Sequence, residues 1–127
     1  EIMTQIATRK TKVGDVLKHE YMPTTGYCRQ EVTVTVAANM PVGAVLELSA
    51  GKYIWVVKAN VANAVAVLVD DRVYDKAAGD HKLVVLVRGP SQVGRSKLAF
   101  ADAVVSADIN TASAALAAKG IEVVKQV

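Results

Sequence analysis

The sequence contains few of the residues that most often carry out chemistry or cross-link a chain. It has 1 Cys and 2 His in 127 residues, so an internal disulfide is excluded. A nucleophilic Cys28 would need one of these 2 histidines as its general base. Only 5% of the residues are aromatic, so the core must be filled by small and β-branched side chains. Apolar runs such as 64–69 and 83–87 are far shorter than the ~18 residues that a membrane span needs. We therefore expect a soluble protein with no membrane partner.

The length and the charge limit the architecture and the partners. A chain of 127 residues has room for one domain with one core, which buries roughly two-thirds of the surface of the unfolded chain. The net charge is +3, but the Lys and Arg residues are scattered among 12 acidic residues and no aromatic platform accompanies them. A direct nucleic-acid partner is not expected.

The N-terminal quarter of the chain differs from the rest. It is polar, contains the turn-like sequence Met22-Pro-Thr-Thr-Gly26 and lacks sustained hydrophobic periodicity. Terminal segments of this kind usually make few core contacts. We expect a flexible N-terminal arm over residues 1–30 and a folded β-rich domain over residues 31–127.

Apolar patterning from Glu31 onward predicts a series of short strands. Val32-Thr-Val-Thr-Val36 alternates as a half-buried strand does. Turn residues at 39–43 and 49–52 bound two further segments, the second of these turns joining them as a hairpin. The continuous runs 64–69 and 82–87 are typical of strands covered on both faces. The predicted strands are 32–36, 44–48, 53–57, 64–69, 82–87 and 121–124, with 98–105 as a further candidate, 58–63 as a helical turn or loop, and 70–81 and 89–97 as loops.

One helix is predicted near the C-terminus. Asp108 or Asn110 can cap its first turn, the Ala-Leu run through Ala118 has high helix propensity, and Gly120 supplies a left-handed ending. The predicted fold class is therefore mostly β with a small α part (α+β), in which a compact β-rich body carries one short C-terminal helix and the flexible N-terminal arm.

A segment after the 82–87 run comes close to a phosphate-binding loop. Gly89-Pro-Ser-Gln-Val-Gly-Arg-Ser96 nearly fits G-x-x-x-x-G-K-[ST], but Arg95 stands in the lysine position, and a guanidinium has a different donor geometry. The chain also lacks the helix-covered parallel sheet on which such loops are normally built. A loop between strands is the favoured interpretation, and nucleotide binding is an alternative.

Two clusters of titratable residues have the residue types of metal sites without their spacing. They are Asp70, Asp71, Asp75, Asp80 and His81, and Asp15, His19 and Glu20. The first lacks the alternating oxygens of a calcium loop, and the second shares a face only if it is helical. No nucleophile elbow or acid–base pair is recognisable. We predict no enzyme activity, no cofactor and no metal site.

The second half of the chain has a distinctive order of elements. Strand 64–69 is followed by Lys82-Leu-Val-Val-Leu-Val-Arg-Gly-Pro90, and Ala114-Ala-Leu-Ala-Ala-Lys-Gly-Ile-Glu-Val-Val124 then forms a helix ending in Gly-Ile and a final strand. This order, with Val85-Leu-Val-Arg-Gly-Pro90 closing one strand, resembles the phage head decoration proteins of the lambda type over roughly residues 45–124.

The resemblance implies a capsid decoration, or cement, protein on the outer surface of the expanded phage head, made in the host cytoplasm. Members of that family form trimers at three-fold and quasi-three-fold positions and clamp the major capsid protein lattice against internal DNA pressure. The implied partners are the major capsid protein and further copies of the chain, and the family's arm orders on the capsid. The side chains expected to bind the capsid are Ile2, Met3, Ile6, Arg9, Lys10 and Val13, and Trp55 is a candidate interface residue.

The alternative function is another small β-rich virion component, such as a tail-tube or head-completion protein. Assembly into rings or tubes, instead of trimers bound to a shell, would distinguish it.

Overall fold

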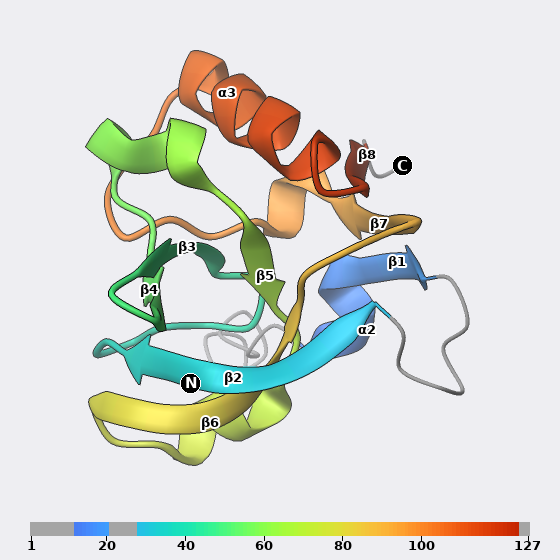
Figure 1. The fold of residues 1–127 in the computed structure, drawn as a ribbon. Helices are drawn as coiled ribbons and strands as arrows, with labels where there is room; N and C mark the ends of the chain where they lie inside the picture. The colour runs from blue at the N-terminus through green and yellow to red at the C-terminus, as the bar shows by residue number, and fades with distance from the viewer. Residues whose placement is uncertain (1–11, 21–27, 125–127) are drawn as a thin grey trace, which may run out of the picture.

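The protein was analysed as a computed structural model that describes residues 12–20 and 28–124 (Figure 1). Helix α2 spans Val13–Val16 and helix α3 spans Ser106–Ala117. Three short 3-10 helices lie between strands: η1 (Lys58–Asn63), η2 (Asp71–Asp75) and η3 (Arg95–Lys97). Strands predominate in two sheets, and the longer helix lies near the C-terminus, which confirms the predicted fold class. None of the helices in the described ranges has the length and apolar character to cross a membrane.

Five strands close into a small barrel in the order β2-β4-β3-β5-β6. They are β2 (Arg29–Val36), β3 (Val45–Ser49), β4 (Lys52–Trp55), β5 (Ala66–Leu68) and β6 (Gly79–Leu86). β2 and β6 pair antiparallel over their whole lengths, whereas β2 meets β4 in parallel only at Val34 and Tyr53. Closure gives every barrel strand a neighbour on both sides, although the β2–β4 seam satisfies few of the backbone groups along it.

The barrel strands follow the apolar pattern of the sequence. In β2, Val34 and Val36 are buried while Thr33 and Thr35 are half-exposed, as the alternation predicts. The predicted hairpin is also present, because β3 and β4 pair antiparallel from Leu46↔Trp55 to Ser49↔Lys52. All of β5 is buried, which agrees with a strand covered on both faces.

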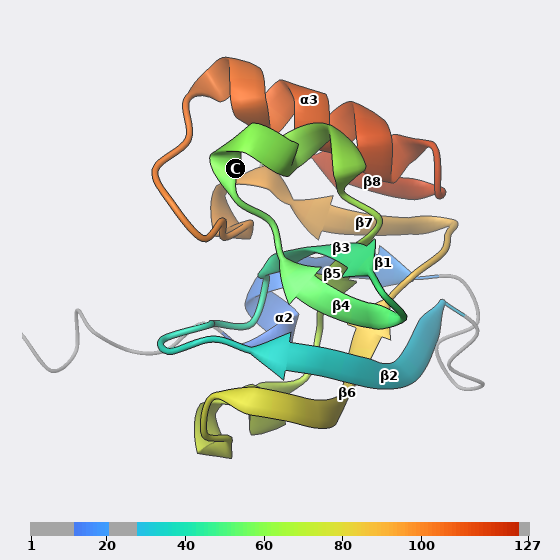
Figure 2. The same cartoon turned by 60° about the vertical axis from the view of Figure 1, so that its left-hand side comes forward.

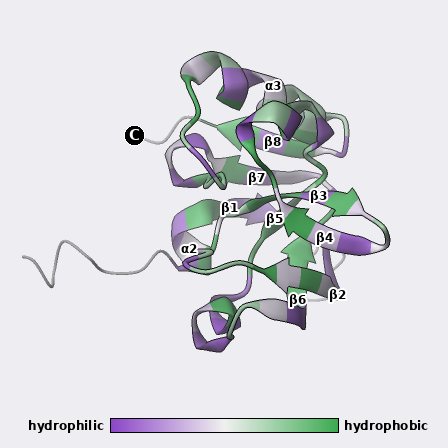
Figure 3. Ribbon diagram, turned by 90° about the vertical axis from the view of Figure 1, so that its left-hand side faces the viewer, coloured by the Kyte–Doolittle hydropathy of each residue, from purple (hydrophilic) through white to green (hydrophobic). Residues whose placement is uncertain are grey.

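A smaller sheet contains β1 (Leu17–Glu20), β7 (Ser91–Gly94) and β8 (Ile121–Val124), with β7 in the centre. β7 pairs antiparallel with β1 and parallel with β8. Helix α3 packs against η1 and β8, and Figure 2 shows α3 and η1 side by side above this sheet. The barrel and the smaller sheet share one core of mainly Val, Ala and Leu, and Figure 3 shows hydrophobic residues concentrated in the strands.

The expectation of few core contacts up to residue 30 is wrong for the part of that segment that the structure describes. Val16 is completely buried, β1 pairs with β7, and Arg29 begins β2. The Arg29 Nε–H donates to both carboxylate oxygens of Glu20, at 3.0 and 3.1 Å. Helix α2 and strand β1 have four residues each, which is too short to show a hydrophobic period in the sequence. Burial of Val16 and pairing of β1 with β7 nevertheless hold them in the body. Residues 12–20 therefore belong to the folded body, and residues 1–11 and 21–27 lie outside the described residues.

The structure also corrects the connection between β6 and α3. The segment predicted as a loop contains β7, and the candidate strand 98–105 is not a strand. Instead, Ala99 forms an isolated bridge with Ala44, and its carbonyl accepts a hydrogen bond from Trp55 Nε1 at 3.0 Å. Leu98, Phe100 and Val104 pack against the core, but the segment forms only isolated backbone hydrogen bonds with the residues around β3 and β4, so its apolar residues follow no strand period.

Helix α3 begins and ends with the chemistry that the sequence predicts. The carboxylate of Asp108 accepts a hydrogen bond from the Val105 amide at 3.1 Å, and this bond is the main reason that the pKa of Asp108 is lowered. Asp108 therefore caps the helix from within its first turn, with Val105 in the N-cap position. Gly120 has a φ of 86°, as its predicted left-handed ending requires.

Two glycine backbones meet where the barrel joins the smaller sheet. The Gly89 amide donates to the Lys119 carbonyl at 3.1 Å, and the Ser91 amide donates to the Gly120 carbonyl at 3.2 Å. A Cβ atom on Gly89 would overlap the carbonyl oxygen of Gly120. Only glycine permits this approach without displacing backbone, so the contact fixes the register of β7 beside β8.

We predict that Gly89→Ala lowers the free energy of unfolding by about 1–3 kcal/mol, because the added methyl meets main-chain atoms that cannot rotate away. Chemical denaturation followed by circular dichroism measures the change. Gly14→Ala is the matched control, since its Cβ has no neighbour within 4 Å. A Gly89→Ala variant as stable as the control would contradict a packing role for this glycine.

Candidate functional site

The segment that resembles a phosphate-binding loop is used to build the smaller sheet. Its centre is β7, which has a partner strand on each side, and the Gly89 and Ser91 amides donate to carbonyls of the α3–β8 turn. A phosphate-binding loop requires free amides that converge on an anion. These amides are already committed to main-chain acceptors, so the nucleotide-binding interpretation has no site here.

The acidic residues from the end of β5 to the start of β6 have separate structural roles. Asp71 accepts a hydrogen bond from the Val13 amide at 3.1 Å. Asp80 accepts a hydrogen bond from Thr35 and forms an ion pair with Lys52, which lowers the pKa of its carboxyl group. Nε2 of His81 lies 2.8 Å from the Ala77 carbonyl. Asp71, Asp80 and His81 therefore make separate contacts, each with a different part of the chain.

Asp70 is the most engaged of these acids. Its side chain is 8% exposed, and its Oδ2 accepts hydrogen bonds from the Val84 amide at 3.0 Å and from Nη2 of Arg72 at 2.7 Å. Burial acts to raise the pKa of Asp70, but the hydrogen bonds from Arg72 and Val84 outweigh it and hold the pKa below its ordinary value. Asp70 thus joins η2 to β6 as an ionised group.

The second candidate metal cluster is also divided. The carboxylate of Asp15 accepts from the Lys12 amide, and Glu20 pairs with Arg29. Across residues 12–20 and 28–124, no three His, Cys, Asp or Glu side chains are arranged to hold a metal ion. Cys28 is buried, and its thiol lies 3.7 Å from the Pro90 carbonyl.

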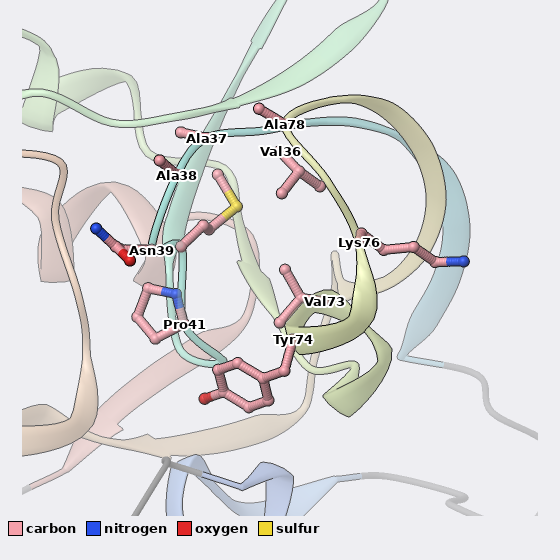
Figure 4. Close-up of a pocket in the computed structure, with 10 residues that line it drawn as sticks. Val36, Ala37, Ala38, Asn39, Pro41, Val73, Tyr74, Lys76 and Ala78 are labelled. Atoms are coloured by element: carbon pink, nitrogen blue, oxygen red, sulfur yellow. The ribbon is translucent and has the colours of Figure 1, made fainter. Parts of the chain in front are cut away.

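The best-formed pocket lies at one end of the barrel and holds about 410 Å³. It lies between the β2–β3 connection and η2, and Met40 is among the residues that line it. Figure 4 shows Pro41 and Val73 around it, with the Lys76 side chain directed away. The hydroxyl of Tyr74 accepts a hydrogen bond from the Val42 amide at 3.1 Å, and burial raises the pKa of Tyr74. Its lining combines apolar side chains with the polar residues Asn39, Tyr74 and Lys76 and brings no acid–base pair together.

The residues expected at interfaces fall into three groups. Ile2, Met3, Ile6, Arg9 and Lys10 lie outside the described residues. Val13 begins α2 and packs against the core. Trp55 is half-buried in β4, where its indole N–H is satisfied by Ala99. Val13 and Trp55 each already make a contact within the folded body. An interface role for either residue stays a prediction.

Other candidates for contact surfaces were missed by sequence reasoning. Leu48, Val57 and Val105 are exposed apolar side chains, with exposed fractions of 55%, 37% and 57%. Glu47 is a buried acid in β3, and its Oε2 has no hydrogen-bond partner in the described part of the chain. No pattern in the sequence separates Glu47 from an ordinary surface acid, because its burial is caused by segments far away along the chain.

A β-rich body whose described polar groups serve mainly to fasten its own elements has the character of a structural or binding protein. The family model described as bacteriophage lambda head decoration protein D matches residues 6–121. The chain belongs to this family, so it is a structural protein of the phage head that binds the capsid, and it is not an enzyme. Comparison with curated proteins and with solved structures gives no match.

We predict that Asp70→Asn lowers the free energy of unfolding at neutral pH by about 1–3 kcal/mol, because the charge-assisted hydrogen bonds from Arg72 are weakened. The folded pKa of Asp70 is lowered, so its stabilisation is present above the unfolded value of about 3.9 and is lost as the pH falls through the folded value. The difference between wild type and variant should therefore close in acid.

Chemical denaturation over a pH series measures this difference. Asp75→Asn removes an exposed carboxylate from the same 3-10 helix and is the control for the loss of one charge. A wild-type advantage over Asp70→Asn that stayed constant down to acid pH would contradict an ionised, hydrogen-bonded Asp70.

Proposed function

We propose that this protein is a cement protein that binds the outside of the expanded phage head as a trimer, at three-fold and quasi-three-fold positions, and stabilises the major capsid protein lattice against internal DNA pressure. The observation that carries the proposal is the family match over residues 6–121. This match favours a head decoration protein over the alternative of a tail-tube or head-completion protein. The proposed location is the outer surface of the virion, after synthesis in the host cytoplasm.

The proposed capsid-binding segment is residues 1–11, which is shorter than the arm of residues 1–30 expected from the sequence. Residues 12–20 contribute Val16 to the core and β1 to the smaller sheet, so their main chain is already committed to the body. The segment before them carries the apolar side chains Ile2, Met3 and Ile6 and the cations Arg9 and Lys10. Removal of residues 1–30 would therefore damage the fold, and a sharper test must spare residues 12–30.

Strand addition to an exposed sheet edge of the capsid protein is the proposed mode of binding. In this mode, main-chain hydrogen bonds provide affinity, and side chains at intervals fix the register. Ordering one arm costs conformational entropy, so a single copy binds weakly. Three arms on one trimer bind far more tightly, because attachment of the first raises the effective concentration of the others.

We predict that Ile2→Ser/Met3→Ser/Ile6→Ser abolishes decoration of undecorated expanded capsids while the melting temperature stays within about 2 °C of wild type. Each apolar side chain removed from a buried contact weakens binding by roughly tenfold or more. Sedimentation of capsids with bound protein gives the occupancy, and cryo-electron microscopy gives its position on the shell.

The paired variants Arg9→Gln/Lys10→Gln and Lys76→Gln/Lys82→Gln separate local from overall charge. Both remove two positive charges, but Lys76 and Lys82 are exposed positions on the folded body. We expect weaker binding only for the first pair.

Full occupancy by the triple Ser variant would refute the arm's role, and a wild-type protein that left expanded shells bare would refute the proposed function.

A further inference from the structure

A shallow depression beside helix α3 has the features of an incomplete contact. It lies between β3, the end of η1 and the C-terminal end of α3, and holds about 440 Å³. Its lining is mainly apolar, with Ala64 and Val65 on one side and Ala115 and Ala118 on the other. Two residues of β3, Glu47 and Leu48, also line it.

Glu47 is the unusual member of this lining. It is 8% exposed, and its Oε2 is a buried atom without a hydrogen-bond partner among residues 12–20 and 28–124. Lys119 lines the same depression, but no ion pair joins it to Glu47. Leaving a buried carboxylate oxygen without a donor is costly, whereas the other buried acids Glu20 and Asp70 each have an arginine partner.

The side chain next to Glu47 in β3, Leu48, is apolar but exposed. Leu48 is 55% exposed, although its strand neighbours Val45 and Leu46 are completely buried. An exposed leucine beside a buried acid without a donor is the reverse of what an isolated surface favours. A partner that covers Leu48 and donates a hydrogen bond to Glu47 removes both the exposed apolar surface and the unpaired buried acid.

We propose that this depression is the contact at which one copy of the chain receives a cationic or N–H donor from the next copy. The chain has a net charge of +3, so a second copy is an electrostatically suitable partner for an acid that lacks a donor in its own chain. The contact joins two different surfaces. A two-fold contact through this patch would instead place Glu47 near Glu47 and add repulsion between like charges.

Contacts between two different surfaces close into rings when the rotation permits it. The inference therefore deepens the proposed function, on which it rests, by naming one of the two surfaces that meet between neighbouring copies of the trimer. It assigns Glu47 to specificity, since a neighbour that brings no donor leaves the acid buried and unpaired.

The test compares the dissociation constant of self-association for wild type, Glu47→Gln, Leu48→Ser and Glu31→Gln by analytical ultracentrifugation over a concentration series. Glu31→Gln removes the same charge from an exposed side chain of β2 and is the matched control. Glu47→Gln and Leu48→Ser should each raise the dissociation constant roughly tenfold or more, whereas Glu31→Gln should leave it unchanged.

Thermal unfolding of dilute, dissociated protein gives a second readout. Glu47→Gln should be at least as stable as wild type there, because it removes a buried charge that lacks a partner within its own chain. Loss of stability in the dissociated protein with unchanged self-association would assign Glu47 an internal role and overturn the inference.

If copies associate only on the shell, the same variants are compared by occupancy of expanded capsids at limiting protein, where a weakened contact appears as lost cooperativity. Variants that decorate shells as cooperatively as wild type would overturn the inference and leave the proposed function standing. A wild-type protein that binds shells as isolated monomers overturns both the trimer and the contact. Bare shells with wild type refute the proposed function independently of Glu47.

Discussion

The approach of two glycine backbones, Gly89 and Gly120, sets the geometry on which most of the molecule depends. Because neither residue has a side chain, the connection between β6 and β7 can lie directly against the turn after α3, and the amides of Gly89 and Ser91 donate to carbonyls there. β7 is then held in parallel register beside β8. Its other edge receives β1, which brings Val16 of the N-terminal segment into the core.

Buried acids show how the small core is supplemented. With few aromatic residues to bury, the chain uses Glu20 with Arg29 to fasten the smaller sheet to β2, and Asp70 with Arg72 to fasten η2 beside β6. In both pairs the arginine offers several donors in a fixed plane, so one carboxylate can be satisfied from several directions. Glu47 has no such arginine partner among the described residues, which is why we propose that a second copy supplies its donor.

Local signals in the sequence were sufficient where a segment's own pattern decides its structure. The alternation of Val32–Val36, the hairpin turn before Lys52 and the left-handed Gly120 all predicted the observed backbone. β7 was missed because its strand character comes from partners on both sides and not from its four residues. The place of residues 12–20 in the body and the burial of Glu47 likewise depend on distant segments. Two of the sequences that carry the family resemblance, around Gly89 and Gly120, lie against each other in the fold.

The closed barrel also has a consequence for how this protein meets other β-rich chains. Unpaired sheet edges are a template on which a further chain can pair, so a β-rich protein with long open edges tends to aggregate. In the described part of the chain, each of the five barrel strands has a neighbour along part of both edges, and the borders of the smaller sheet are β1 and β8, of four residues each. Edges this short or already partly occupied offer little backbone to a further strand, so the topology itself limits edge-to-edge polymerisation.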